Sequence, residues 1–275
     1  MTRILAIFAI LFAFAAPSAM AKNDYSCDKK FIFFPGGPEG GPFGTIVYNG
    51  AVAAAEHTGC DVDYYWSQWN SEIMIKQFKE AVALQPDGIA IYGFPGDEAM
   101  RPIIKEARSM GIVITTMNTP LPDLEAEYKT EGFGYAGADL FDAGYNLGAK
   151  GVEVCGLSAG DKAFVWGLAS MPNRGERTKG AIKALEDLGV EVVYQEIPDN
   201  VNSDASQGTP MYVATYSANP DIKMAITDHG GLTASLPTYM KAAGHGTEEV
   251  CGAGFDLSAP IVDGINSGYI DVVID

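Results

Sequence analysis

The chain has 275 residues, and 47% of them are hydrophobic, which is enough to bury a large core in one or two domains. Only 19% are charged, a composition that does not favour long disordered tracts. Asp and Glu number 35 against 18 Lys and Arg, so the formal net charge is -17 at pH 7. Binding to nucleic acid or to an anionic membrane surface requires basic surface, and this composition argues against both.

The first 21 residues have the pattern of a secretory signal peptide. Arg3 supplies a positive start, residues 4–16 form an uncharged apolar run, and residues 19–21 (Ala-Met-Ala) form a small-x-small cleavage site. The alternative is a membrane anchor, but this run is too short to cross a hydrocarbon core of roughly 30 Å. We therefore expect export, with cleavage before Lys22.

Strand and helix patterns alternate along the first half of the chain. Short apolar runs that end in Gly, Pro or Asn predict strands, and the amphipathic stretches between them predict helices. This alternation is typical of right-handed βαβ units and a parallel sheet with helices on both faces. The strands are expected at residues 31–34, 61–66, 88–92 and 112–117, and the helices at 44–58, 71–84 and 97–110.

The pattern then repeats after 130 residues. Residues 50–56 (Gly-Ala-Val-Ala-Ala-Ala-Glu) resemble residues 180–186 (Gly-Ala-Ile-Lys-Ala-Leu-Glu), and in both halves they end a helix that precedes a strand. A duplicated α/β unit accounts for this similarity. We therefore predict two similar, doubly wound parallel-sheet domains of the Rossmann-like type, covering residues 22–136 and 137–275.

Polar and aromatic residues gather in the turns that follow the predicted strands. In open α/β sheets ligands bind beyond the carboxyl ends of strands, so these turns are the candidate binding site. Amides, carboxylates and a guanidinium beside an aromatic surface can recognise the hydroxyls of a polyol ring. The same residue types also serve as core aromatics and helix caps, which is the alternative reading for each of them. The candidates are Phe43, Tyr92, Asn118, Trp166, Arg174, Asp228 and Asp256.

One enzyme motif competes with the binding interpretation. Residues 156–160 (Gly-Leu-Ser-Ala-Gly) match the G-x-S-x-G pattern of serine hydrolases, with Ser158 as the nucleophile. That chemistry needs the serine between a strand and the following helix, whereas Ser158 follows a predicted helix and precedes a strand. A secreted hydrolase is therefore the alternative from a different functional class. The three histidines share no metal-ligand spacing and no P-loop is present, so we expect no catalytic residue, metal or cofactor.

Four cysteines permit three disulfide connectivities, and an exported protein folds where disulfides form. Cys27 precedes the first predicted strand and Cys60 precedes the second. If these strands are parallel neighbours, both cysteines lie at the same end of the sheet. Cys27–Cys60 is therefore the preferred pair, and four buried thiols are the alternative.

The order and spacing of these motifs resemble the periplasmic solute-binding proteins of ABC importers, in the ribose/galactose-binding (type I, LacI-like) family. The features that carry the resemblance are residues 42–43, the turn 117–119, residues 174–180, Asp228 and residues 254–256. This resemblance covers the chain beyond the signal segment. It implies a periplasmic monomer whose two domains are joined by a hinge, a sugar or polyol in the cleft between them, and a membrane permease as partner.

By the same resemblance, Phe43 is the stacking aromatic of the first domain. Asn118 stands where ribose binders carry an acidic residue, and Arg174 stands beside the position of the family's binding arginine. Asp228 occupies a position where the family often has Asn, and Asp256 matches the family's binding Asp.

Asn202, in the loop 198–203, takes the place of another contact. The resemblance leaves open a different small polar ligand, such as an autoinducer or an amino-acid derivative, with a link to a chemoreceptor. It also implies a C-terminal truncation, because such proteins continue past the strand at residues 269–274.

Overall fold

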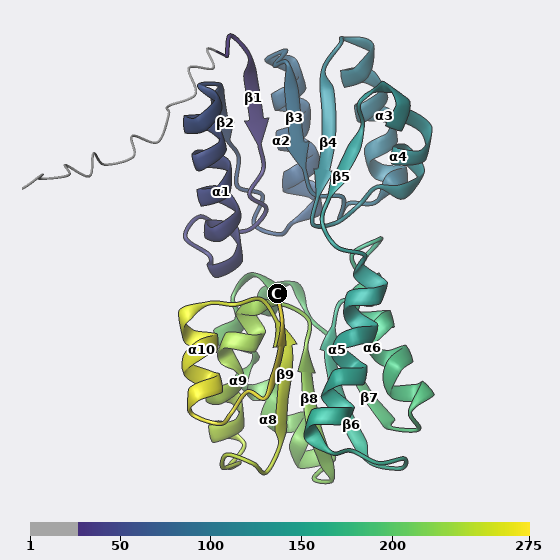
Figure 1. Ribbon diagram of the computed structural model, residues 1–275, viewed down its shortest axis with the longest axis vertical. Helices are drawn as coiled ribbons and strands as arrows, with labels where there is room; N and C mark the ends of the chain where they lie inside the picture. Colours follow the sequence, from purple (N-terminus) through teal and green to yellow (C-terminus); the bar gives the residue numbers. More distant parts are fainter. Residues whose placement is uncertain (1–26) are drawn as a thin grey trace, which may run out of the picture.

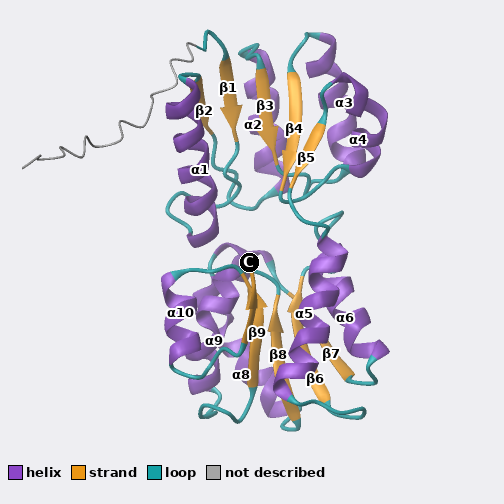
Figure 2. Cartoon of the chain, in the orientation of Figure 1, coloured by secondary structure: helices purple, strands orange, loops and turns teal. Residues whose placement is uncertain are grey.

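The computed structural model describes residues 27–275, so the predicted signal peptide lies outside the described part of the chain. Two parallel five-stranded sheets lie one above the other, each with helices on both faces (Figure 1). The α/β fold with two similar domains, predicted from the alternating pattern and its repeat, is confirmed. The strands of both sheets point toward the space between the domains, which brings their carboxyl ends together there (Figure 2).

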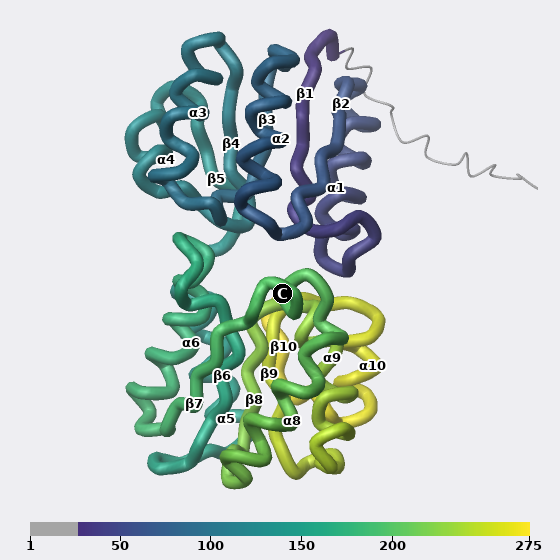
Figure 3. Tube along the Cα trace, turned by 180° about the vertical axis from the view of Figure 1, so that it is seen from behind, coloured from purple at the N-terminus to yellow at the C-terminus, as the bar shows by residue number. Residues whose placement is uncertain are grey.

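The first domain contains a sheet in the order β2-β1-β3-β4-β5. Its strands are β1 (Lys30–Phe33), β2 (Asp61–Tyr64), β3 (Gly88–Ile91), β4 (Val113–Met117) and β5 (Gly134–Ala136). Its helices are α1 (Pro42–Thr58), α2 (Ser71–Ala83), α3 (Asp97–Ser109), α4 (Pro122–Tyr128) and the 3-10 turn η1 (Lys129–Glu131). Helix α1 covers one face of the sheet, and α2 and α3 cover the other (Figures 1 and 3).

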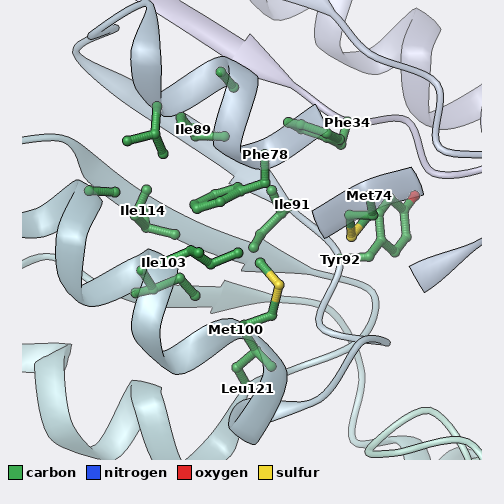
Figure 4. Packing of buried hydrophobic residues seen from close by; sticks show 14 of the residues in the cluster. Phe34, Met74, Phe78, Ile89, Ile91, Tyr92, Met100, Ile103, Ile114 and Leu121 are labelled. Carbon is green, nitrogen blue, oxygen red and sulfur yellow. The ribbon is translucent and has the colours of Figure 1, made fainter. Parts of the chain in front are cut away.

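The core of the first domain lies between the sheet and the apolar faces of α2 and α3. Met74 and Phe78 are one turn apart on α2 and fully buried, as the spacing of apolar residues predicts. They meet Ile91 and Ile114 from the sheet and Met100 from α3 (Figure 4). This packing holds in place the strands whose carboxyl ends face the second domain.

The second domain contains a sheet in the order β10-β9-β8-β6-β7. Its strands are β6 (Lys162–Gly167), β7 (Glu191–Glu196), β8 (Ile222–Thr227), β9 (Cys251–Phe255) and β10 (Val272–Ile274). Its helices are α5 (Leu140–Cys155), α6 (Glu176–Asp187), α7 (Asp199–Ser203), η2 (Ala205–Gly208), α8 (Thr209–Ala218), α9 (Gly230–Ala242) and α10 (Ala259–Asn266). Helices α5 and α6 pack against one another on one face, and α8, α9 and α10 cover the other.

Two glycines set the close approach of α5 and α6. A Cβ atom at Gly144 would overlap the main-chain carbonyl of Arg177, and one at Gly180 would overlap the carbonyl of Phe141. Only glycine lets two helix backbones come this near. Their packing therefore determines where the side chain of Arg177 lies.

The chain passes from the first domain to the second through residues 137–139. Strand β5 ends at Ala136 within the first sheet, and α5 begins at Leu140 against the second. Figure 3 shows this crossing at one edge of the molecule.

Both pairs of cysteines form disulfides. β1 and β2 are parallel neighbours, as expected, and Cys27 and Cys60 each lie just before one of these strands. The two cysteines form a disulfide, which confirms the pairing preferred from the sequence. A second disulfide, Cys155–Cys251, joins the end of α5 to the start of β9, a pairing that the positions of these cysteines in the sequence did not indicate.

Candidate ligand-binding site

A cavity of about 360 Å³ is lined by residues of both domains, many of them in turns that follow the carboxyl ends of strands. Five of the residues proposed from the sequence line it: Phe43, Asn118, Arg174, Asn202 and Asp256. They come from both domains and are up to 213 positions apart in the chain (256 less 43). The topology therefore brings most of the candidate residues to one place.

Tyr92 and Trp166 are corrections to the predicted site. Both side chains are fully buried, and neither lines the cavity. Tyr92 packs edge-on against the ring of Trp69 at a centroid distance of 5.5 Å, and Trp166 packs against Tyr239 at 5.6 Å. Each residue lies at or near a strand end with its side chain directed into the core of its own domain. They support the cavity from behind and are not placed to contact a ligand directly.

Aromatic rings form the first-domain wall of the cavity. Trp69, which sequence reasoning missed, lines it together with Phe43 and Phe94. The Trp69 ring lies over the backbone at Gly36 and Gly37, where a Cβ atom at Gly37 would come within 2.6 Å of the indole nitrogen. Trp69 has a φ of 55°, in the left-handed region that bulky residues avoid. Its place thus depends on a strained turn and on two glycines, neither of which hydrophobic periodicity reveals.

A buried ion-pair cluster underlies the second-domain wall. Arg174 donates to the Asp228 carboxylate, and Thr178 Oγ1 donates to the same group at 2.7 Å. Arg177 Nη2 donates to the main-chain carbonyl of Asp228 at 2.7 Å and lies 3.8 Å from its carboxylate. Burial alone would raise the pKa of Asp228, but the two arginines hold it below its usual value. Asp228 therefore positions cavity residues and does not itself line the cavity.

Arg177 is the second cavity residue that the sequence pattern did not indicate, since the family resemblance points to Arg174, three positions earlier. Both residues line the cavity, and both are 7% exposed. The Arg177 guanidinium also lies over the ring of Phe255 at 4.1 Å. Burial, followed by the charge of Arg174, lowers the pKa of Arg177 to about 10, so it remains a cation at neutral pH. The available signal was its position on the buried face of α6.

Asp256 and His229 complete this wall. Asp256 Oδ2 accepts a hydrogen bond from the Gly230 amide at 2.7 Å, and burial raises the pKa of Asp256. His229 precedes α9, and its Nδ1 accepts from the Gly231 amide at 3.2 Å. Burial lowers the pKa of His229 to about 4, so the ring is neutral near pH 7. With Nδ1 accepting, the proton of the neutral ring is on Nε2.

Contacts between the domains lie on both sides of the cavity. Near the crossing, Asn173 Nδ2 donates to Asp97 Oδ2 and to the carbonyl of Pro120, both at 3.0 Å. On the opposite side, α1 of the first domain contacts α9 of the second. We call the Asn173–Asp97–Pro120 set the latch.

Ser158 does not belong to this cavity. It lies in an exposed turn before the amino end of β6, whereas the cavity lies at the carboxyl ends of the strands. Within residues 27–275, no cluster of His, Cys, Asp and Glu side chains could hold a metal ion. None of the helices in that part of the chain is both long enough and apolar enough to cross a bilayer.

Several solved structures share this fold. A solute-binding protein from Burkholderia graminis C4D1M, in complex with D-arabinose, is 20% identical, with a TM-score of 0.76 over 89% of this chain and 82% of the other. A carbohydrate transporter protein from Acidothermus cellulolyticus 11B, in complex with myo-inositol, is 21% identical, with a TM-score of 0.72 over 90% and 80%. A glucose-galactose binding protein from Geobacillus stearothermophilus is 20% identical, with a TM-score of 0.75 over 88% and 82%.

No curated protein sequence matches the chain. A family model described as the periplasmic binding protein domain matches residues 32–275, which takes in both domains and every residue of the cavity. Members of this family bind solutes and are not enzymes, which argues against the hydrolase alternative. The chain belongs to the periplasmic binding protein domain family.

Proposed function

We propose that this protein is the periplasmic substrate-binding component of an ABC importer and that it binds a monosaccharide or polyol between its two domains. One observation carries the proposal: the cavity has aromatic rings on one wall and buried polar and charged groups on the other. A sugar ring has an apolar C–H face and a rim of hydroxyls, which match these two walls.

The division of roles follows from the chemistry of the side chains. Phe43 and Trp69 offer aromatic surface to the C–H face of a ring. Asp256 retains an oxygen that can accept from a hydroxyl, and Asn118 and Asn202 offer both donors and acceptors. The solved structures with bound D-arabinose and myo-inositol support this class of ligand.

Capture would occur by closure of the domains around the ligand. A ligand that contacts both walls stabilises the closed form relative to the open form, and closure presents a joined surface to the permease. The latch and the α1–α9 contact border the cavity on two sides and would form as the domains approach. We propose that the protein acts as a monomer.

Calorimetric titration with pentoses, hexoses and polyols tests the proposal. We expect one or more to bind, and we expect Trp69→Ala to weaken that binding at least about tenfold, because aromatic residues dominate buried binding surfaces. Phe141→Ala removes an aromatic side chain that lies outside the cavity and serves as the matched control. Absence of binding by every sugar and polyol to the folded protein would refute the proposal.

The periplasmic location rests on the family and on the predicted signal peptide. We expect the secreted protein to begin at Lys22, which N-terminal sequencing of protein from a periplasmic extract would establish. An intact Met1 on protein in the cytoplasmic fraction would contradict it.

A further inference from the structure

Three cavity side chains carry N–H groups that have no hydrogen-bond partner. Arg174 Nη1, Arg177 Nε and His229 Nε2 are all buried, and none finds an acceptor within residues 27–275. All three residues line the cavity on its second-domain wall. A buried polar group without a partner is unfavourable, and a charged one more so. Three together on one wall indicate that the ligand supplies the acceptors.

This part of the wall offers donors alone. A guanidinium has no acceptor, and His229 has already used its acceptor nitrogen on the Gly231 amide. A neutral hydroxyl placed here can accept, but it must also find an acceptor for its own proton. A carboxylate oxygen only accepts hydrogen bonds. It therefore matches a part of the wall where Arg174, Arg177 and His229 offer only donors.

The charges on this wall favour the same ligand group. The Asp228 carboxylate faces both Arg174 and Arg177, so one anion serves two cations. Two other carboxyls line the cavity. Asp204 is exposed, and its oxygens accept from Ser206 and Gln207. Asp256 accepts from the Gly230 amide and interacts with the charges of Arg177 and Arg174, but within residues 27–275 it forms no ion pair with either of them. Two buried guanidinium groups thus share one directly paired carboxylate, and a ligand anion would supply a second.

We propose that the ligand is an acidic sugar, an aldonate or uronate, whose carboxylate binds the corner formed by Arg174, Arg177 and His229. The inference rests on the proposed function and specifies the ligand class of the same site. The hydroxyls of such a ligand remain available to Asp256 and to the asparagines, and its ring to the aromatic wall. Arginine pairs with a carboxylate through parallel hydrogen bonds, which adds geometric selectivity.

The test compares acids and neutral compounds that share a carbon skeleton. Calorimetric titrations would use D-glucuronate against D-glucose, D-galacturonate against D-galactose, D-gluconate against D-glucitol, and L-arabinonate against L-arabinose. We expect at least one acid to bind about tenfold or more tightly than its neutral counterpart, the range for hydrogen bonds to charged groups.

Two variants of His229 separate the ligand contact from the structural role. Asn can reproduce the Nδ1 acceptor that caps α9, but it has nothing at the position of Nε2. Gln can reproduce the Nε2 donor but not the cap. We expect His229→Asn to keep the melting temperature and to weaken the acid at least about tenfold. We expect His229→Gln to lower the melting temperature and to bind the acid more tightly than His229→Asn does.

Arg177→Gln tests the charge itself, and Lys183→Gln is its control, because Lys183 is an exposed cation on the same helix. The affinity for the acid should fall about tenfold or more in Arg177→Gln and stay unchanged in Lys183→Gln. If the neutral member of each pair binds as tightly as its acid, the acidic-ligand inference is wrong and the sugar proposal stands. If neither acids nor neutral compounds bind, both are wrong.

Discussion

Removing the Asp228 carboxylate should destabilise the second domain strongly. Asp228→Ala leaves the Arg174 and Arg177 guanidinium groups buried, with no carboxylate between them. The substitution also removes the acceptor that Thr178 Oγ1 uses at 2.7 Å. Both side chains of the Arg174–Asp228 pair are almost inaccessible, at 9% and 2%, so the guanidinium groups would stay largely desolvated after the substitution.

The expected cost is about 3–5 kcal/mol of unfolding free energy, the range measured when one member of a buried ion pair is removed. The control is Glu153→Ala on α5. Glu153 pairs with Lys150 at 2.8 Å, but the two side chains are 71% and 53% exposed. An exposed pair contributes about 0–1 kcal/mol, so this variant should unfold almost like the parent protein.

Urea unfolding followed by circular dichroism and tryptophan fluorescence measures both variants. The pH dependence of the unfolding free energy gives a second measure of what the Asp228 carboxylate contributes. The pKa of Asp228 is lowered in the folded state, so its stabilisation is present above its unfolded value and is lost as the pH falls through the folded value. The parent protein should lose this part of its stability in acid, whereas Asp228→Ala has none to lose. Equal stability of Asp228→Ala and Glu153→Ala at pH 7 would refute the reasoning.

Three further predictions concern closure, pH and the disulfide. Asn173→Ala removes both latch hydrogen bonds and should raise the ligand dissociation rate several-fold in stopped-flow measurements, and an unchanged rate would show that the latch does not hold the closed form. Because the pKa of His229 is lowered to about 4, the unfolded chain takes up a proton below pH 6.5 before the folded chain does. Stability should therefore fall between pH 6.5 and 4 by up to about 3 kcal/mol, and His229→Asn should lose that dependence in urea titrations at each pH. Replacing both cysteines of Cys27–Cys60 by Ser opens a loop with a sequence separation of 33 and should cost about 3–4 kcal/mol, and a melting temperature equal to that of the parent would contradict this.

Much of the fold could be predicted because the interactions that specify it are local in sequence. The alternation of short apolar runs with helical periodicity located β1 to β4, and the apolar spacing of Met74 and Phe78 identified the buried face of α2. The turns after the predicted strands indicated Phe43, Asn118 and Asp256 as binding residues, because a parallel sheet brings the carboxyl ends of its strands to one edge. The position of Cys27 and Cys60 before neighbouring strands likewise indicated their pairing.

The tertiary structure alone decided which side chains face the cavity. Trp69 reaches it through a left-handed turn supported by Gly36 and Gly37, and Arg177 through the close packing of α5 on α6. Tyr92 and Trp166 have the same chemistry as cavity residues but point into their domain cores. Periodicity records which residues are buried within one element. The direction of a side chain at the end of a strand depends on turn conformation and on helix packing between residues far apart in the chain, and apolar periodicity specifies neither.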